Sequence, residues 1–250
     1  MMKNYLNLLL LTFSVTIFAQ KQMSSLKTSP STTTLKNTNS TPELSKINDS
    51  VTALIPYKKD GNFGFINQRG KIIIPPIYSN VGFFTEDCNL LNSPNSKAKK
   101  FGTSDYASVR LNGKDYRINR LGRRVYYFKD EDLGKCQSEF RAQLFHAYIM
   151  NYAYGIIEDS KFKNPADYRD FTIYPQYDYL HILEGDDLKN PMIVASRGNK
   201  FGIIDINNKV IVPFEYSDIK RNYSWKLARL FEVTKDGEHY YYIDINNTRY

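Results

Sequence analysis

The chain has 250 residues and a formal net charge of +8, and 14% of its residues are aromatic, with 20 Tyr and 15 Phe but a single Trp. This length allows a sizeable buried core in one or two domains, and the Tyr and Phe content favours β-structure. The charge argues against a nucleic-acid binder. Residues 1–19 carry +1 and residues 20–48 carry +3, so residues 49–250 carry only +4, interspersed with acidic side chains.

Residues 1–19 have the organisation of a secretory signal peptide. Lys3 precedes an apolar run over residues 5–18, and Ala19 supplies a small residue before Gln20. We expect cleavage between Ala19 and Gln20 and export to the periplasm or the cell exterior. A membrane anchor is the alternative, but a spanning helix needs about 20 apolar residues and this run is shorter. We therefore expect no stable membrane span after signal removal.

Residues 20–48 are predicted to form a disordered polar leader. Ser, Thr, Asn and Lys dominate this segment, and its leucines are too sparse to make an apolar face. Such a composition buries too little apolar surface to offset the entropy of ordering. The folded domain is therefore predicted over residues 49–250.

A repeated segment organises residues 49–250. Residues 63–78 read FGFINQRGKIIIPPIY, and residues 201–216 read FGIIDINNKVIVPFEY. Self-similarity of this kind indicates a repeat architecture. In the first copy, an Asp-Gly turn at residues 59–62 and a second turn ending at Gly70 separate three short apolar runs, the pattern of a β-meander.

Weaker copies raise the number of repeats to about five. The second spans residues 107–127, the third begins at residue 147, the fourth contains the match at residues 201–216, and the fifth spans residues 231–248 without a third strand. An insertion over residues 161–171 interrupts the third copy, and such insertions often carry partner contacts. Between the second and third copies, Phe140 and Leu144 have helical spacing, so residues 132–144 are the one helix candidate.

Several positions recur in the repeats. Glycine follows an aromatic residue in three copies, at Phe63-Gly64, Tyr154-Gly155 and Phe201-Gly202. Because a glycine inside a strand marks the close approach of another group, we infer that rings cover these glycines in the core. Six residues beyond the glycine position lie residues that tolerate positive φ, which predicts one shared turn conformation. These residues are Gly70, Gly122, Asn208 and Asn247, and the two strong copies end at Tyr78 and Tyr216.

This pattern of aromatic residue, Gly, apolar pair, turn, Lys, apolar run, Pro and Tyr resembles the WG (or KWG) repeat of bacterial proteins, many of them exported. The resemblance covers most of residues 51–250. The tryptophan that names the family is replaced, and the second and fifth copies are degenerate. The Trp positions hold Phe63, Asp115, Tyr154, Phe201 and Tyr240. The resemblance implies a β-rich array that serves as an interaction or structural module, with no established reaction.

Repeats of about 40 residues suit an open solenoid-like array or a closed propeller-like ring. In a propeller the first and last segments share a blade. The fifth copy lacks its third strand, and nothing upstream of Val51 supplies it. We therefore predict an all-β protein of tandem hairpins and meanders in an open array, with a closed ring as the alternative.

No catalytic, cofactor or metal site is predicted. His146, His181 and His239 lack a second ligand at metal-binding spacing, so we interpret them as core or surface residues. The acidic residues within 184–187 surround a glycine and are interpreted as a solvated loop, with acid–base catalysis as the alternative. Four arginines within residues 117–124, followed by two tyrosines, resemble a single-strand binder but are interpreted as a solvated strand face.

Cys88 and Cys136 are the two cysteines of the chain. An even number suits a disulfide in an oxidising compartment, and their offsets within their copies allow them to lie on neighbouring repeats. Two buried free thiols are the alternative.

The sequence thus favours a non-catalytic exported module that binds an unidentified protein or envelope polymer. The insertion at residues 158–172 and exposed tyrosines are the candidate contacts, and neither nucleic acid nor a cofactor is expected. The alternatives are glycan or peptidoglycan binding through tyrosine rings and, less favoured, an enzyme. A concave groove with three or more exposed aromatic residues would favour glycan, a flat face of mixed charge would favour protein, and convergent carboxylates or histidines in a deep pocket would favour catalysis.

Overall fold

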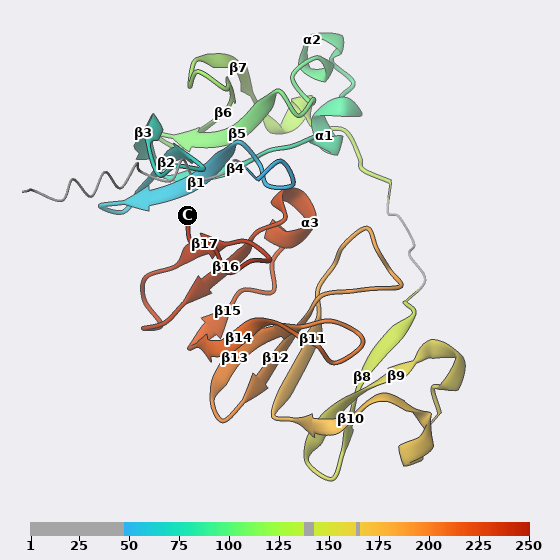
Figure 1. The fold of residues 1–250 in the computed structure, drawn as a ribbon. Helices are drawn as coiled ribbons and strands as arrows, with labels where there is room; N and C mark the ends of the chain where they lie inside the picture. Colours follow the sequence, from blue (N-terminus) through green and yellow to red (C-terminus); the bar gives the residue numbers. More distant parts are fainter. Residues whose placement is uncertain (1–47, 138–142, 164–165) are drawn as a thin grey trace, which may run out of the picture. The chain divides into compact units, whose positions relative to one another are not determined.

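The computed structural model describes residues 48–137, 143–163 and 166–250. The predicted signal peptide with its cleavage site, nearly all of the predicted leader, and Phe140 lie outside these residues. Within them the regular structure is almost entirely β, in five small antiparallel sheets of hairpins and meanders (Figure 1). None of their helices is long and apolar enough to cross a membrane.

The strands follow the predicted repeats. The first sheet contains β1 (Leu54–Lys59), β2 (Asn62–Asn67) and β3 (Ile72–Tyr78). The second contains β4 (Asn80–Phe84), β5 (Tyr106–Leu111), β6 (Lys114–Asn119) and β7 (Arg124–Phe128). The third contains β8 (Phe145–Met150), β9 (Ala153–Glu158) and β10 (Phe171–Tyr177). The fourth contains β11 (Tyr179–Ile182), β12 (Ile193–Arg197), β13 (Lys200–Ile204) and β14 (Val210–Tyr216). The fifth contains β15 (Asp218–Ile219), β16 (Phe231–Thr234) and β17 (Tyr241–Ile243).

The short helices lie in connections that the sequence pattern did not indicate. They are α1 (Cys88–Leu91), α2 (Ser96–Lys99) and α3 (Ser224–Ala228), with 3-10 turns at Asp130–Asp132, Asp159–Lys161 and Tyr168–Asp170. The described part of residues 132–144 contains only the end of a 3-10 turn, so the predicted helix is not found there. Local caps explain α1 and α2, because the side chains of Asp87 and Asn95 accept hydrogen bonds from first-turn N–H groups.

One turn conformation recurs in four repeats. The φ angles are 73° at Gly70, 77° at Gly122, 64° at Asn208 and 61° at Asn247. In the first turn the Oδ1 atom of Asn67 accepts hydrogen bonds from the backbone N–H groups of residues 69 and 71, both at 3.0 Å. The same pair of bonds forms in the other three turns, at Asn119, Asp205 and Asp244. A side chain therefore holds each turn in the left-handed conformation that Gly and Asn tolerate.

A backbone carbonyl of the third strand lies against each of the three strand glycines. A Cβ atom added at any of them would clash with a carbonyl oxygen of the third strand: Ile74 for Gly64, Ile173 for Gly155 and Val212 for Gly202. The inferred ring cover is therefore wrong for Gly64, whereas a phenylalanine ring also approaches Gly155 and Gly202. The cause is a register shift between the second and third strands, which moves the third-strand backbone across the glycine.

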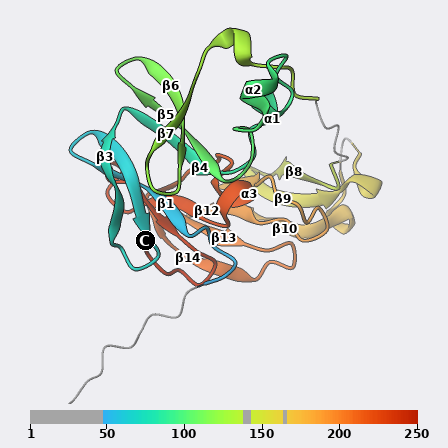
Figure 2. The same ribbon diagram turned by 90° about the horizontal axis from the view of Figure 1, so that it is seen from above.

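The sheets pack in an order that differs from their order along the chain (Figures 1 and 2). Hydrophobic clusters join the β1–β3 sheet to the β4–β7 sheet, the β8–β10 sheet to the β11–β14 sheet, and the β11–β14 sheet to the β15–β17 sheet. A fourth cluster, with Ile55, Ile66 and Leu230, joins the last sheet to the first. The packing order is β4–β7, β1–β3, β15–β17, β11–β14, β8–β10. This confirms the predicted all-β array, with no closed barrel in the described part of the chain.

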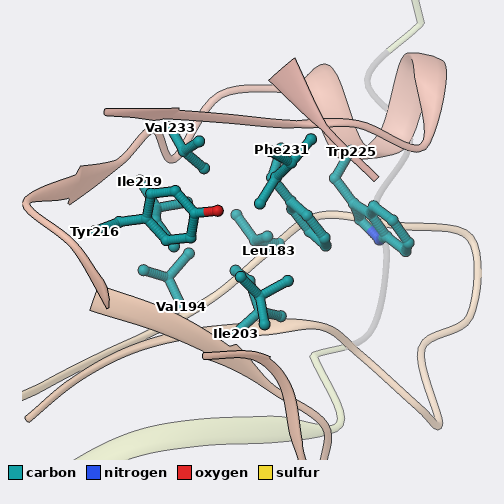
Figure 3. Packing of buried hydrophobic residues seen from close by; sticks show 10 residues of the cluster. Leu183, Val194, Ile203, Tyr216, Ile219, Trp225, Phe231 and Val233 are labelled. Carbon is teal, nitrogen blue, oxygen red and sulfur yellow. The ribbon is translucent and has the colours of Figure 1, made fainter. Parts of the chain in front are cut away.

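Figure 3 shows the cluster between the β11–β14 and β15–β17 sheets. Ile203 and Tyr216 come from the first of these sheets, and Phe231 and Val233 from the second. The indole of Trp225 stacks on Phe231 with ring centroids 4.6 Å apart. Burying each such side chain contributes about 1.5–3 kcal/mol, so neighbouring repeats depend on each other for a dry interior.

Tyrosine hydroxyls add polar links between neighbouring sheets. Tyr177 donates a hydrogen bond to Oδ1 of Asn208 at 2.7 Å, and Tyr216 donates to Oδ1 of Asn247 at 2.5 Å. Burial raises the pKa of both phenols, which keeps them protonated as donors. The last residue of β10 and the last residue of β14 are thereby each hydrogen-bonded to the left-handed turn of the following repeat.

The fifth repeat lacks a third strand, and residues from both ends of the described domain make its junction with the first repeat. Asp244 accepts hydrogen bonds from Nδ2 of Asn48 at 3.0 Å and from the hydroxyl of Tyr250 at 3.1 Å. The side chain of Gln68 accepts a hydrogen bond from the backbone N–H of Asn48 at 2.8 Å. These bonds replace the missing strand with a polar network.

Candidate functional site

The β4–β7 and β8–β10 sheets are the two outermost sheets of the packing order. Each has one face packed on a neighbouring sheet, and an insertion covers the other face. In the first sheet the insertion lies between β4 and β5, at residues 85–105, and in the second it lies between β9 and β10, at residues 159–170. Terminal repeats of an array need such covers because they have no further neighbour.

A continuous chain of rings lies where the second insertion meets its sheet. We call it the insertion surface, and it consists of His146, Tyr148, Phe162, Tyr168, Phe171 and Tyr174. Successive ring centroids are 4.7 Å apart for His146–Phe162, 6.1 Å for Phe162–Tyr148, 5.9 Å for Tyr148–Phe171, 6.3 Å for Phe171–Tyr168 and 6.5 Å for Tyr168–Tyr174. These are ordinary contact distances for aromatic side chains.

Three of these rings stay half exposed. Phe162 is 48% exposed, Tyr168 49% and Tyr174 59%. By contrast, Phe171 is buried beneath them, at 7%. The insertion therefore packs on a buried ring of β10, Phe171, and leaves apolar area in contact with water.

Polar and charged groups surround the exposed rings. Nδ2 of Asn151 donates a hydrogen bond to the Tyr168 hydroxyl at 2.9 Å. Ion pairs join Lys163 to Asp170 at 2.9 Å and Arg169 to Asp167 at 3.0 Å. Hydrogen bonds from the side chains of Lys163 and Arg169 lower the pKa of their partner carboxyls, so both carboxylates are charged at neutral pH.

The first insertion covers its sheet in a different way. The guanidinium of Arg117, which is 2% exposed, donates hydrogen bonds to the carbonyl oxygens of Phe101 at 2.7 Å, Thr103 at 3.0 Å and Thr85 at 3.3 Å. Burial lowers the pKa of Arg117. The ring of Phe101 stacks on Tyr126 at 4.7 Å and completes the cover.

The arginines at residues 117–124 therefore do not share one solvated strand face, as the sequence suggested. Arg117 is buried, Arg120 lies over the ring of Phe84 at 5.4 Å, and Arg124 lies over Tyr116 at 5.3 Å. The arginines point in different directions because Arg117 lies in β6, Arg120 and Arg123 lie in the turn that follows it, and Arg124 begins β7.

A disulfide joins Cys88 to Cys136, with Cα atoms 5.4 Å apart. It ties the first residue of α1 to the segment that follows β7. In the same segment the backbone N–H of Gly134 donates a hydrogen bond to the carbonyl of Asn89 at 2.8 Å. Both cysteines thus belong to the cover of the β4–β7 sheet.

The histidines and the acidic loop do not converge. Among the described residues, no group of three or more His, Cys, Asp or Glu side chains could hold a metal ion. The acidic loop packs on α3, since Glu184 pairs with Lys226 at 3.5 Å and Asp186 with Arg229 at 3.3 Å. The three histidines do not form one cluster. His146 pairs with Asp159 and His239 with Asp236, while His181, whose pKa is lowered by burial, shares the lining of a small cavity with His146.

A cavity of about 1030 Å³ lies beside α3 and the acidic loop. The aromatic residues in its lining are Phe145 and Tyr223. Among the described residues, the lining therefore has fewer than the three exposed aromatic residues that would favour a glycan groove. The exposed rings of the insertion surface, Phe162, Tyr168 and Tyr174, are not part of this lining.

A family model of the WG containing repeat matches residues 63–88 and 201–229. The chain is therefore similar to WG repeats over these two segments. The two matches begin at Phe63 and Phe201, in the first and fourth copies, where the sequence resemblance is strongest. Searches of the curated proteins and of the solved structures found no match. WG repeats form a module of unclear function, so the candidate site must be argued from its own geometry.

Sequence reasoning located the insertion of the third repeat but missed the rings that make the insertion surface. Tyr148 and Tyr174 lie in strands, at positions that looked like ordinary repeat residues, and Phe162 and Tyr168 lie in the insertion. The available signal was the density of Tyr and Phe on both sides of the insertion. It also missed Arg117, because one arginine in a basic run does not indicate burial.

Proposed function

We propose that this WG-repeat protein is an exported, non-catalytic interaction module that binds a protein partner through the insertion surface. The observation that carries the proposal is the chain of six rings, of which Phe162, Tyr168 and Tyr174 are half exposed. Aromatic side chains are enriched in protein interfaces and supply most of their hot spots. Burying this apolar area against a partner would stabilise a complex by about 25 cal/mol per Å².

The surroundings of the rings favour a protein over a glycan. Acidic and basic side chains alternate around them in pairs, which suits the mixed-charge rim of a protein interface. The planes of Tyr168 and Tyr174 are inclined by 39°, so the two rings do not form one flat platform for a sugar chain. Glycan binding therefore remains the second candidate function, and the experiment below separates the two.

The N-terminal segment and the disulfide support export of the protein. Residues 1–19 have the pattern of a signal peptide, and a Cys88–Cys136 disulfide suits an oxidising compartment. We expect the mature protein to begin at Gln20. Mass spectrometry of the protein from the envelope and culture fractions tests this, and an intact Met1 terminus in all fractions would contradict it.

The binding proposal is tested by capture from the native envelope fraction with a triple variant, Phe162→Ser, Tyr168→Ser and Tyr174→Ser. The control variant changes three equally exposed apolar residues in other repeats, Ile77→Ser, Leu121→Ser and Tyr127→Ser, which are 51%, 72% and 44% exposed. We expect a protein captured by the wild type and the control to be lost with the triple variant. Equal capture by all three forms would refute the role of the insertion surface.

Two further results would change the function itself. Co-sedimentation with purified peptidoglycan that depends on the same three rings would establish glycan binding instead. Recovery of a small metabolite that the protein converts would establish an enzyme.

A further inference from the structure

We propose that the cavity beside α3 binds an extended, positively charged peptide segment, at a site separate from the insertion surface. The cavity has a volume of about 1030 Å³. Ligand pockets typically measure about 300–1,000 Å³, so this one accommodates several residues of an extended chain. Its lining does not include Tyr168 or Tyr174, on which the proposed protein contact depends.

Part of the cavity wall is apolar. Phe145 begins β8, Ile182 ends β11, and Leu183 and Pro191 flank the acidic loop, where both are buried. Leu188 of the same loop is 37% exposed and adds an accessible apolar side chain. The lining therefore offers contacts to aliphatic groups as well as to charges.

The charge of the lining is opposite to that of the whole chain. Among the residues that the structure describes, three carboxylates, of Glu86, Glu184 and Asp187, line the cavity together with one cation, Lys226. Lys226 is already paired with Glu184 at 3.5 Å. A hydrogen bond from the side chain of Asn190 lowers the pKa of Asp187, which keeps this carboxylate charged. In a protein with a net charge of +8, the cavity thus attracts cations.

The combination of apolar walls and carboxylates selects among cations. A metal ion would use the carboxylates and leave the apolar walls unused, and no cluster suitable for a metal ion exists among the described residues. Lysine and arginine carry a long aliphatic stem that ends in a charge, so they can contact both parts of the lining. Lysine or arginine alternating with an apolar residue is the peptide chemistry that fits.

The experiment uses the purified protein and a fluorescent, end-blocked Lys-Leu-Lys-Leu-Lys peptide, with Glu-Leu-Glu-Leu-Glu as the anionic probe. Fluorescence anisotropy measures the Kd. We expect the cationic peptide to bind, binding to weaken as salt rises, and the double variant Glu86→Gln, Glu184→Gln to weaken it by about tenfold or more. The matched control is Glu131→Gln, Glu238→Gln, whose carboxylates lie outside the lining, and it should leave Kd unchanged.

The variant Leu188→Ser tests the apolar wall separately, and we expect a several-fold weaker Kd. Urea unfolding of each variant verifies that the fold is retained. Absence of binding by the cationic peptide, equal binding of the anionic peptide, or an unchanged Kd in the double glutamine variant would each overturn the proposal. The triple serine variant of the insertion surface should bind the peptide normally, so the two proposals can fail independently.

Discussion

An insertion covers one face of each of the two outermost sheets, but different interactions hold the two covers in place. In the β4–β7 sheet, a buried guanidinium, stacked rings and a disulfide hold the cover. In the β8–β10 sheet, exposed ion pairs and half-exposed rings hold it. Covering a terminal sheet therefore does not require leaving apolar rings in water. Their exposure in the β8–β10 sheet is the feature that a partner would explain.

The energetics of the two covers differ for a physical reason. The buried guanidinium of Arg117 donates its hydrogen bonds to backbone carbonyl groups of the first insertion instead of to water. Removal of this side chain therefore leaves these carbonyl groups without their donor. Exposed ion pairs such as Arg169–Asp167 gain little, because water and salt screen them. The first cover should thus be strongly coupled to global stability, and the second weakly.

The largest expected effect is that of Arg117→Met. The variant removes the donors and leaves three carbonyl groups without them, so we expect a loss of about 3–5 kcal/mol in the free energy of unfolding. Urea denaturation measures it. The control Arg123→Met changes an exposed arginine of the same run and should cost less than about 0.5 kcal/mol. Similar losses in both variants would remove the distinction between a sealed and an open cover.

The double variant Cys88→Ser, Cys136→Ser should have the next largest effect. The disulfide spans 48 residues of sequence, and removing it should cost about 2–4 kcal/mol, mainly through the entropy of the unfolded chain. Hydrogen exchange should also show reduced protection at residues 85–105 and no change at residues 166–170. A uniform change over both covers would show that the disulfide does not act locally.

A smaller effect is expected from Asp132→Asn. Hydrogen bonds from the side chain of Asn95 and the backbone N–H of Lys129 lower the pKa of this nearly buried carboxyl. Its stabilisation, about 1 kcal/mol, is present above the unfolded-state pKa of about 3.9 and is lost as the pH falls through the lower folded-state value. Urea unfolding between pH 2 and pH 7, roughly the range of this titration, should show a shallower acid decline in the variant. An unchanged pH profile would contradict this assignment.

The smallest effect on stability is expected from Tyr174→Ser. This ring is 59% exposed, so the free energy of unfolding should change by less than about 0.5 kcal/mol while partner capture falls. Tyr126→Ser in the other cover should give the reverse result, a clear loss of stability without loss of capture, because its ring stacks on Phe101. A large destabilisation by Tyr174→Ser would mean that the insertion surface is a structural cover alone.

The repeats, the strands and the left-handed turns followed from the sequence because their causes are local. Gly70 and Asn208 tolerate positive φ, and Asn67 and Asp205 hold the turn with their own side chains. The role of Gly64 was only partly predicted. A glycine signals close approach, but the register shift of β3 decides that the approaching group is a carbonyl.

The sequence by itself determined that this chain builds tandem β-repeats, since alternation, turn residues and self-similarity act within each repeat. Only the tertiary structure decided that the last repeat packs on the first, that Arg117 is buried, and that the rings of the insertion surface gather on one outer face. These outcomes depend on which sheet faces meet, and that choice is made by shape and burial between segments far apart in the chain.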